Sequence, residues 1–184
     1  NSTYIRVTWL IVPRPRTNIM NFIFTLISLL CLSLGIAQAA KRNIVLFVTD
    51  DQSPDFGAYG NSALKTPNLD ALANDGTRFD HAFCTTASCS ASRSVILSGL
   101  HNHANGHYGH QHSYHKFNSY GNLISLPVYL SHGGYRTARC GKYHVAPESI
   151  YKFDQSIPGH SRSPVEMAEN SKAFLTEDSE KPFI

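Results

Sequence analysis

Two adjacent carboxylates, Asp50 and Asp51, are the first residues along the chain that could do chemistry. They follow the apolar run of residues 43–49, which has the pattern of a strand buried on both faces. Ligands bind to α/β sheets beyond the carboxyl ends of such strands, and carboxylate oxygens suit Ca²⁺ or Mg²⁺. Taken alone, the pair is explained more simply by a solvated acidic turn, because two carboxylates are too few ligands for a complete metal site.

Residues 89–99 are a second stretch whose residues could carry out chemistry. Cys89 stands at the start of an expected helix over residues 90–98, and Arg93 follows it by four positions. A helix N-terminus and a nearby cation both favour the thiolate, which is the nucleophilic form of cysteine. A buried structural cysteine followed by an ordinary helix fits these residues equally well.

Residues 134–144 are the third stretch. An expected strand leads into Gly141, and Lys142 and His144 would emerge at its end. A cation and a titratable imidazole in such a place suit anion binding and proton transfer. A surface loop with ordinary polar side chains is the alternative interpretation.

Strands and helices that alternate along the chain would position these three stretches. Strands are expected over residues 43–49, 79–83, 135–140 and 181–184. Helices are expected between Thr66 and Gly76 and over residues 90–98, 126–130 and 164–176. Alternation of this kind predicts the α/β class, with a layered fold.

A histidine-rich tract lies between the second and third stretches. Its imidazoles stand at mixed spacings, and clusters of imidazoles can bind metal ions. The tract therefore leaves open a different function, that of a secreted metal-binding module without catalysis. Its members are His101, His103, His107, His110, His112 and His115.

Residues 1–39 have the features of a secretory leader. Arginines without any acid are followed by an apolar run over residues 22–36 and by a small-x-small cleavage pattern at residues 37–39. We predict a signal peptide that begins at Met20, with an upstream segment before it. The apolar run is shorter than the ~20 residues of a membrane span. The remaining chain is therefore expected to be secreted or periplasmic, or lysosomal in a eukaryote, without a membrane span.

The composition excludes several other classes of protein. Hydrophobic residues make up 42% and charged residues 16%, which argues against a disordered or collagen-like chain. The net charge of +3 lies wholly in residues 1–40. Residues 41–184 are therefore formally neutral and contain no basic run, so nucleic-acid binding is not expected.

Taken together and in this order, the stretches resemble the sulfatase family. The C-x-P/A-x-R motif of that family, with its downstream S/T-G, is matched by residues 89–99, and the motif G-Y-x-T-x-x-x-G-K-x-H by residues 134–144. Residues 105–111, 117–119 and 141–148 resemble the N-sulfoglucosamine sulfohydrolase subgroup. The resemblance implies a three-layer α/β sandwich of the alkaline-phosphatase type with a mostly parallel central sheet. Residues 40–184 would be the N-terminal part of its catalytic domain, truncated and inactive by itself.

The resemblance also implies the reacting group. Cys89 would be oxidised by a formylglycine-generating maturation enzyme to formylglycine, whose hydrate is a geminal diol. Ca²⁺ would be held by Asp50, Asp51 and the modified Cys89. With Cys89 consumed in this way, Cys84 and Cys140 are expected to be buried apolar residues rather than a disulfide pair.

Further roles follow from the same resemblance. Arg93 would orient the diol, Lys142 would bind both the sulfate and the diol, and His144 would hydrogen-bond the second hydroxyl and act as the base. The substrate would be a sulfated glycan, with an N-sulfoglucosamine-like sulfamate or sulfate ester as its reacting group. An arylsulfatase-like O-sulfatase acting on another sulfated sugar is the alternative. Ala91 departs from the proline that many members have, which puts in question which maturation system converts Cys89.

Overall fold

The structure is a computed structural model that describes residue 23 and residues 41–184. The predicted signal peptide and its cleavage pattern therefore lie outside the described residues, apart from Ile23. Among the described residues, no helix combines the length and the apolar character that crossing a membrane requires.

A small parallel sheet carries the third stretch. Strand β1 (Ala138–Cys140) pairs in parallel with β2 (Gln155–Ile157), and Arg139 lies opposite Ser156. A further parallel bridge joins Arg136 to Phe183, so residue 183 comes back beside the chain that leads into β1. The expected strands at 135–140 and 181–184 are thus partly formed, whereas β2 was not predicted.

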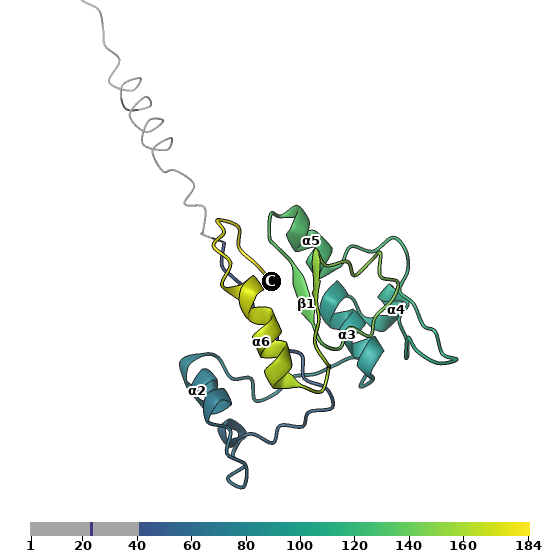
Figure 1. The fold of residues 1–184 in the computed structure, drawn as a ribbon. Coiled ribbons are helices and arrows are strands. Elements are labelled where there is room, and N and C mark those ends of the chain that lie inside the picture. Colours follow the sequence, from purple (N-terminus) through teal and green to yellow (C-terminus); the bar gives the residue numbers. More distant parts are fainter. Residues whose placement is uncertain (1–22, 24–40) are drawn as a thin grey trace, which may run out of the picture. The chain divides into compact units, whose positions relative to one another are not determined.

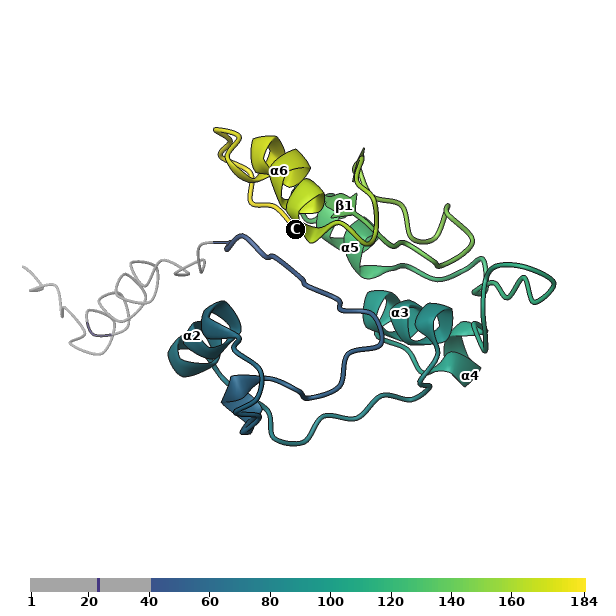
Figure 2. The same cartoon turned by 60° about the horizontal axis from the view of Figure 1, so that its bottom comes forward.

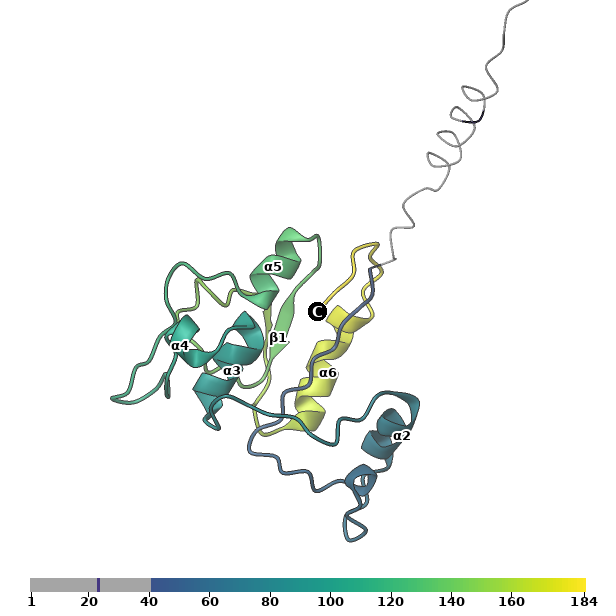
Figure 3. The same cartoon turned by 180° about the vertical axis from the view of Figure 1, so that it is seen from behind.

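Helices lie on both sides of this sheet (Figures 1, 2 and 3). Helix α6 (Pro164–Leu175) is on one side of β1, and α3 (Cys89–Ser98) and α5 (Leu126–His132) are on the other. The layering is that of an incomplete α/β sandwich, as predicted. Within residues 41–184, the other helical elements are η1 (Gly57–Tyr59), α2 (Pro67–Asp75) and α4 (Asn102–Asn105).

Two apolar clusters hold these layers together. Ile157, Phe174 and Phe183 join β2, α6 and the bridged segment, with the two phenylalanine rings edge to face at 5.6 Å between centroids. The second cluster, Val145, Ile150 and Tyr151, is formed after β1, and partly buried side chains of α3 and its neighbours pack against it. Burial of these side chains is the main force that fixes the loop after β1 against α3.

The prediction of a strand at residues 43–49, buried on both faces, is wrong. The segment is extended but is not a strand, and the side chain of Phe47 is 83% exposed. A strand buried on both faces needs partners along both edges. In the described part of the chain, the backbone of this segment makes one such contact, from Ile44 N–H to the carbonyl of Phe183 at 2.8 Å.

Two other sequence predictions also fail. Residues 79–83 form no strand, and Phe83 is 95% exposed. Cys84 is exposed rather than buried, whereas Cys140 is half-buried. Alternating apolar residues predict a strand only where the chain supplies a partner, and residues 79–84 lack one among the described residues.

Candidate functional site

The three stretches whose residues could carry out chemistry meet around Asp50. A hollow of about 410 Å³ is lined by Asp50, Asp51, Cys89 and Arg93. A second hollow, of about 380 Å³, shares Asp50 and adds Lys142 and His144. All of the residues predicted to form the site therefore line two hollows that have Asp50 in common.

Cys89 is the first residue of α3 and faces the first hollow. Ser88 precedes it in an extended conformation and accepts the first helical hydrogen bond, from Ser92 N–H at 2.8 Å. The first N–H groups of a helix have no partner within the helix, and the N-terminus carries a partial positive charge. The half-buried thiol of Cys89 therefore lies where an anion would be stabilised.

Arg93 connects the segments that form the site. Its guanidinium donates to the carbonyl of Lys142 at 3.0 Å and to the carbonyl of Val48 at 3.5 Å. It also lies 3.7 Å from the carboxylate of Asp50, and its side chain is only 11% exposed. A planar group with several N–H donors suits this role, because it can hold two carbonyls and a carboxylate at once.

Asp50 and Lys142 form an ion pair at the boundary between the two hollows. The ammonium of Lys142 donates to both carboxylate oxygens, at 2.8 and 2.9 Å. The hydrogen bond from Lys142 is the main reason that the pKa of Asp50 is lowered, and the same bond raises the pKa of Lys142. Both groups are therefore charged at neutral pH. Since the Asp50 side chain is 48% exposed, the pair contributes to the arrangement of charges more than to stability.

His144 lies in the second hollow as a neutral imidazole. Burial, followed by the positive charge of Lys142, lowers the pKa of His144 to about 4. The ring is therefore unprotonated at neutral pH and can accept a proton. Its Nδ1 is buried without a hydrogen-bond partner, and its Nε2 contacts Nδ1 of His112.

Three residues at the site have a left-handed backbone. The φ angle is 56° at Asp51, 57° at His144 and 82° at Gly141. Glycine adopts such angles without penalty, whereas Asp51 and His144 do so at a cost on the order of 1 kcal/mol or more. The turn at Gly141 redirects the chain as it leaves β1 and so places Lys142 and His144 at the hollow.

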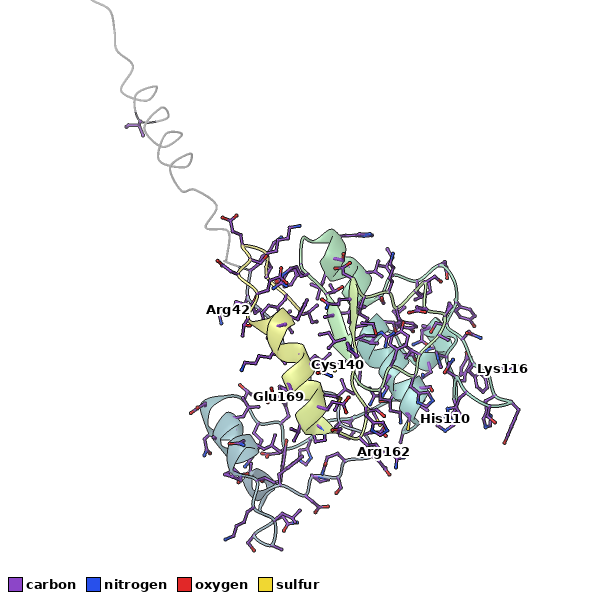
Figure 4. The ribbon with its side chains drawn as sticks, in the orientation of Figure 1. Arg42, His110, Lys116, Cys140, Arg162 and Glu169 are labelled. Atoms are coloured by element: carbon purple, nitrogen blue, oxygen red, sulfur yellow. The ribbon has the colours of Figure 1, made fainter. Side chains whose placement is uncertain are left out.

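The structure adds residues that the sequence analysis did not single out. Gln111, Ser161 and Arg162 line the second hollow with Lys142 and His144. Figure 4 labels Arg162 and His110, which belong to loops far apart in the sequence. The histidine-rich composition could have drawn attention to the region of Gln111, whereas no motif marks residues 161–162.

The histidine-rich loop is attached to α3. The buried hydroxyl of Ser90 accepts a hydrogen bond from the N–H of Gln111 at 3.0 Å. Farther along the loop, Phe117 N–H donates to the carbonyl of His110 at 3.1 Å. Because Cys89 directly precedes Ser90 in α3, these bonds hold residues 110–112 near Cys89.

The donors in the first hollow fit part of a calcium site. Asp50 and Asp51 supply carboxylate oxygens, which Ca²⁺ prefers, and both line the same hollow as Cys89. Ca²⁺ takes about six to eight oxygens, so these residues would fill only some of its coordination positions. The ion pair with Lys142 shows that Asp50 is ionised and already binds a cationic group at this place.

Comparison with known proteins places this chain in a family. The family model described as Sulfatase matches residues 42–183. Human N-sulphoglucosamine sulphohydrolase is 41% identical over 84% of this chain and 32% of its own length. Human iduronate 2-sulfatase is 31% identical over 91% of this chain and 32% of its own length. The ulvan-active sulfatase of Formosa agariphila is 32% identical over 80% of this chain and 29% of its own length.

This chain spans about a third of the length of these relatives. Because the family model covers nearly all of the described residues, the fold is the α/β superfold of the alkaline-phosphatase type. The chain belongs to the sulfatase family.

Proposed function

We propose that the protein carrying this chain hydrolyses a sulfate ester or sulfamate on a sulfated glycan. The observation that carries the proposal is the position of Cys89 at the N-terminus of α3, in one hollow with Asp50, Asp51 and Arg93. A nucleophile beside a helix N-terminus and a buried guanidinium suits attack on an anionic group. The alternative of a histidine-rich module without catalysis is not retained, because the family model covers residues 42–183.

The reacting group would be formylglycine, made from Cys89 by a formylglycine-generating maturation enzyme. Its hydrate supplies two hydroxyls on one carbon, one to attack sulfur and one to allow release of sulfate. The helix N-terminus and Arg93 would orient that group and offset negative charge around it. Ala91 is fully buried, and its carbonyl accepts a hydrogen bond from Asn102 of α4 at 3.0 Å, so the maturation enzyme would have to act on the unfolded chain.

Ca²⁺ is the metal ion that we propose for the first hollow. Asp50, Asp51 and the modified Cys89 would hold it, together with ligands from outside the described residues. When bound, Ca²⁺ would lower the pKa of the nucleophile and stabilise charge on the transferred group.

Lys142 and His144 would bind the substrate. The ammonium of Lys142, held charged by Asp50, would attract the sulfate. The neutral imidazole of His144 would accept a proton from the second hydroxyl, because its pKa of about 4 leaves it unprotonated. Gln111 and Arg162 line the same hollow and would contact the sugar that carries the sulfate.

The substrate class that we favour is an N-sulfoglucosamine-like sugar of a heparan-type glycan. The support is the 41% identity with the human protein named N-sulphoglucosamine sulphohydrolase. The alternative is an O-sulfatase, since a relative at 32% identity is named an ulvan-active sulfatase. Two substrates that differ only in an N-sulfate or a 6-O-sulfate on glucosamine would separate these activities.

We also propose that residues 1–39 include a secretory signal, and that residues 40–184 are the N-terminal part of the catalytic domain. The protein would then be secreted, periplasmic or lysosomal. Sequencing the N-terminus of protein purified from its native host tests the proposal. Cleavage after Ala39 is expected, whereas an intact leader on the mature protein would contradict it.

The test of the catalytic proposal has two parts. Mass spectrometry of the peptide containing residue 89, from the complete protein made in its native host, should detect an aldehyde. The same preparation should release sulfate, and Cys89→Ala should abolish the release while Cys84→Ala leaves it unchanged. An unmodified thiol at residue 89 in an active preparation would refute the proposed nucleophile.

A further inference from the structure

Three imidazoles come together beside the second hollow. They belong to His110 and His112, in the loop after α4, and to His144, in the loop after β1. One ring nitrogen from each lies within 4.8 Å of the others. The side chains of His110 and His144 are half-buried, whereas His112 is exposed.

The three rings are stacked against one another. The rings of His112 and His144 are nearly parallel, with 12° between planes and 4.6 Å between centroids. The ring of His110 lies 4.9 Å from that of His112 and 5.8 Å from that of His144.

The nitrogens of this cluster lack enough protein partners. Nδ1 of His110 and Nδ1 of His144 are both buried without a hydrogen-bond partner among the described residues. Nδ1 of His112 meets Nε2 of His144 directly. A hydrogen bond between these two nitrogens requires that one of them carries the proton. The Nδ1 atoms of His110 and His144 have no such partner among the described residues, and a metal ion would supply one.

We propose that His110, His112 and His144 bind a divalent transition-metal ion such as Zn²⁺. Three imidazole ligands with a fourth position open to water are a common Zn²⁺ arrangement. The donors differ in kind from the carboxylates of Asp50 and Asp51, because imidazole favours Zn²⁺ and oxygen favours Ca²⁺. The molecule would thus hold two cation sites of different selectivity.

The surroundings of the cluster both oppose and favour this binding. Lys142 and Arg162 line the same hollow and repel a cation, although Asp50 offsets the charge of Lys142. The loop is held in place by the hydrogen bond from Gln111 N–H to Ser90. A ligand set that is already assembled loses little entropy when the metal ion binds, and this favours affinity.

Binding there would have one consequence that rests on the proposed function. A metal ion on His144 would use the lone pair that the proposed proton transfer needs. Micromolar Zn²⁺ should therefore inhibit sulfate release from the complete protein, while Ca²⁺ should not.

The test measures metal binding directly, so that it does not depend on activity. The complete protein, saturated with Ca²⁺, is titrated with Co²⁺, whose visible absorption reports low-coordinate nitrogen ligation, and Zn²⁺ is then added as competitor. One Co²⁺ per chain with visible bands is expected. His112→Gln and His110→Gln should each weaken Zn²⁺ binding by at least about tenfold. His103→Gln, in the same tract but outside the cluster, should bind as the unsubstituted protein does.

X-ray absorption of the zinc-loaded, unsubstituted protein provides a readout without substitution and should detect imidazole ligands. A zinc ion surrounded by oxygen alone would overturn the proposal, as would normal binding by both variants with native circular dichroism. If Zn²⁺ binds as expected but the complete protein releases no sulfate from any sulfated glycan, the metal site stands and the proposed function fails.

Discussion

Gly141 controls the direction in which the chain leaves β1, and Gly141→Ala would test how strongly the site depends on that turn. The φ angle of Gly141 is 82°, and a Cβ atom there would collide with Sδ of Met167. The left-handed conformation costs alanine about 1–2 kcal/mol. Moving the flexible thioether aside adds on the order of 1 kcal/mol. We therefore expect Gly141→Ala to reduce the free energy of unfolding by about 2–3 kcal/mol.

Urea unfolding of the complete protein would measure this loss, and two other glycines provide matched controls. Gly60 has a φ of 93°, and nothing lies within 4 Å of the place that a methyl group would occupy, so Gly60→Ala should cost about 1–2 kcal/mol from strain alone. Gly121 has neither feature, so Gly121→Ala should be nearly neutral. Adding Met167→Ala to Gly141→Ala should remove the clash but not the strain. A Gly141→Ala protein as stable as Gly121→Ala would refute the reasoning.

Three further predictions concern the charges and imidazoles around the site. Arg93→Lys keeps the positive charge but cannot hold the carbonyls of Lys142 and Val48 together, so thermal unfolding should show that the free energy of unfolding falls by about 1–2 kcal/mol. Unchanged stability would contradict the inference that Arg93 connects these segments. Asp50→Asn should lower the pKa of Lys142 in NMR titrations, because the hydrogen bond from Lys142 to Asp50 raises it. Burial lowers the pKa of His107 in the folded protein. As the pH falls, His107 is therefore protonated in the unfolded chain before it is protonated in the folded protein. The free energy of unfolding should then decrease as the pH falls below about 6.5. His107→Met should flatten that decrease, which unfolding midpoints measured across this pH range would show.

The sequence was sufficient to predict the elements whose signals are local. Helix α3 begins at Cys89 and ends before Gly99, and α2 begins at Pro67 and ends before Gly76, as expected from the cap and stop residues. Such signals work because a helix satisfies its own backbone hydrogen bonds. The residues of both sulfatase motifs could also be identified from the sequence, because each motif lies within one short segment.

The sequence was not sufficient where the outcome depends on a partner elsewhere. Residues 43–49 have the composition of a buried strand, yet their exposure depends on which strands lie alongside. Strand β2 pairs with β1, although two of its three residues are exposed and it has no apolar pattern. The meeting of His112 with His144 likewise depends on how two loops pack, and nothing in either loop indicates the other.

The contacts of Asp50 favour the chemical interpretation that we propose for each stretch over the ordinary one. A solvated acidic turn would leave its carboxylate to water, but Lys142 binds both oxygens and Arg93 lies 3.7 Å away. A surface loop at Lys142 would not need the buried guanidinium that holds its carbonyl. A structural cysteine would be fully buried, whereas Cys89 is half-buried in the hollow that Asp50 lines. The chemistry that we propose therefore depends on the meeting of three ordinary segments, and Arg93 contacts residues of the other two.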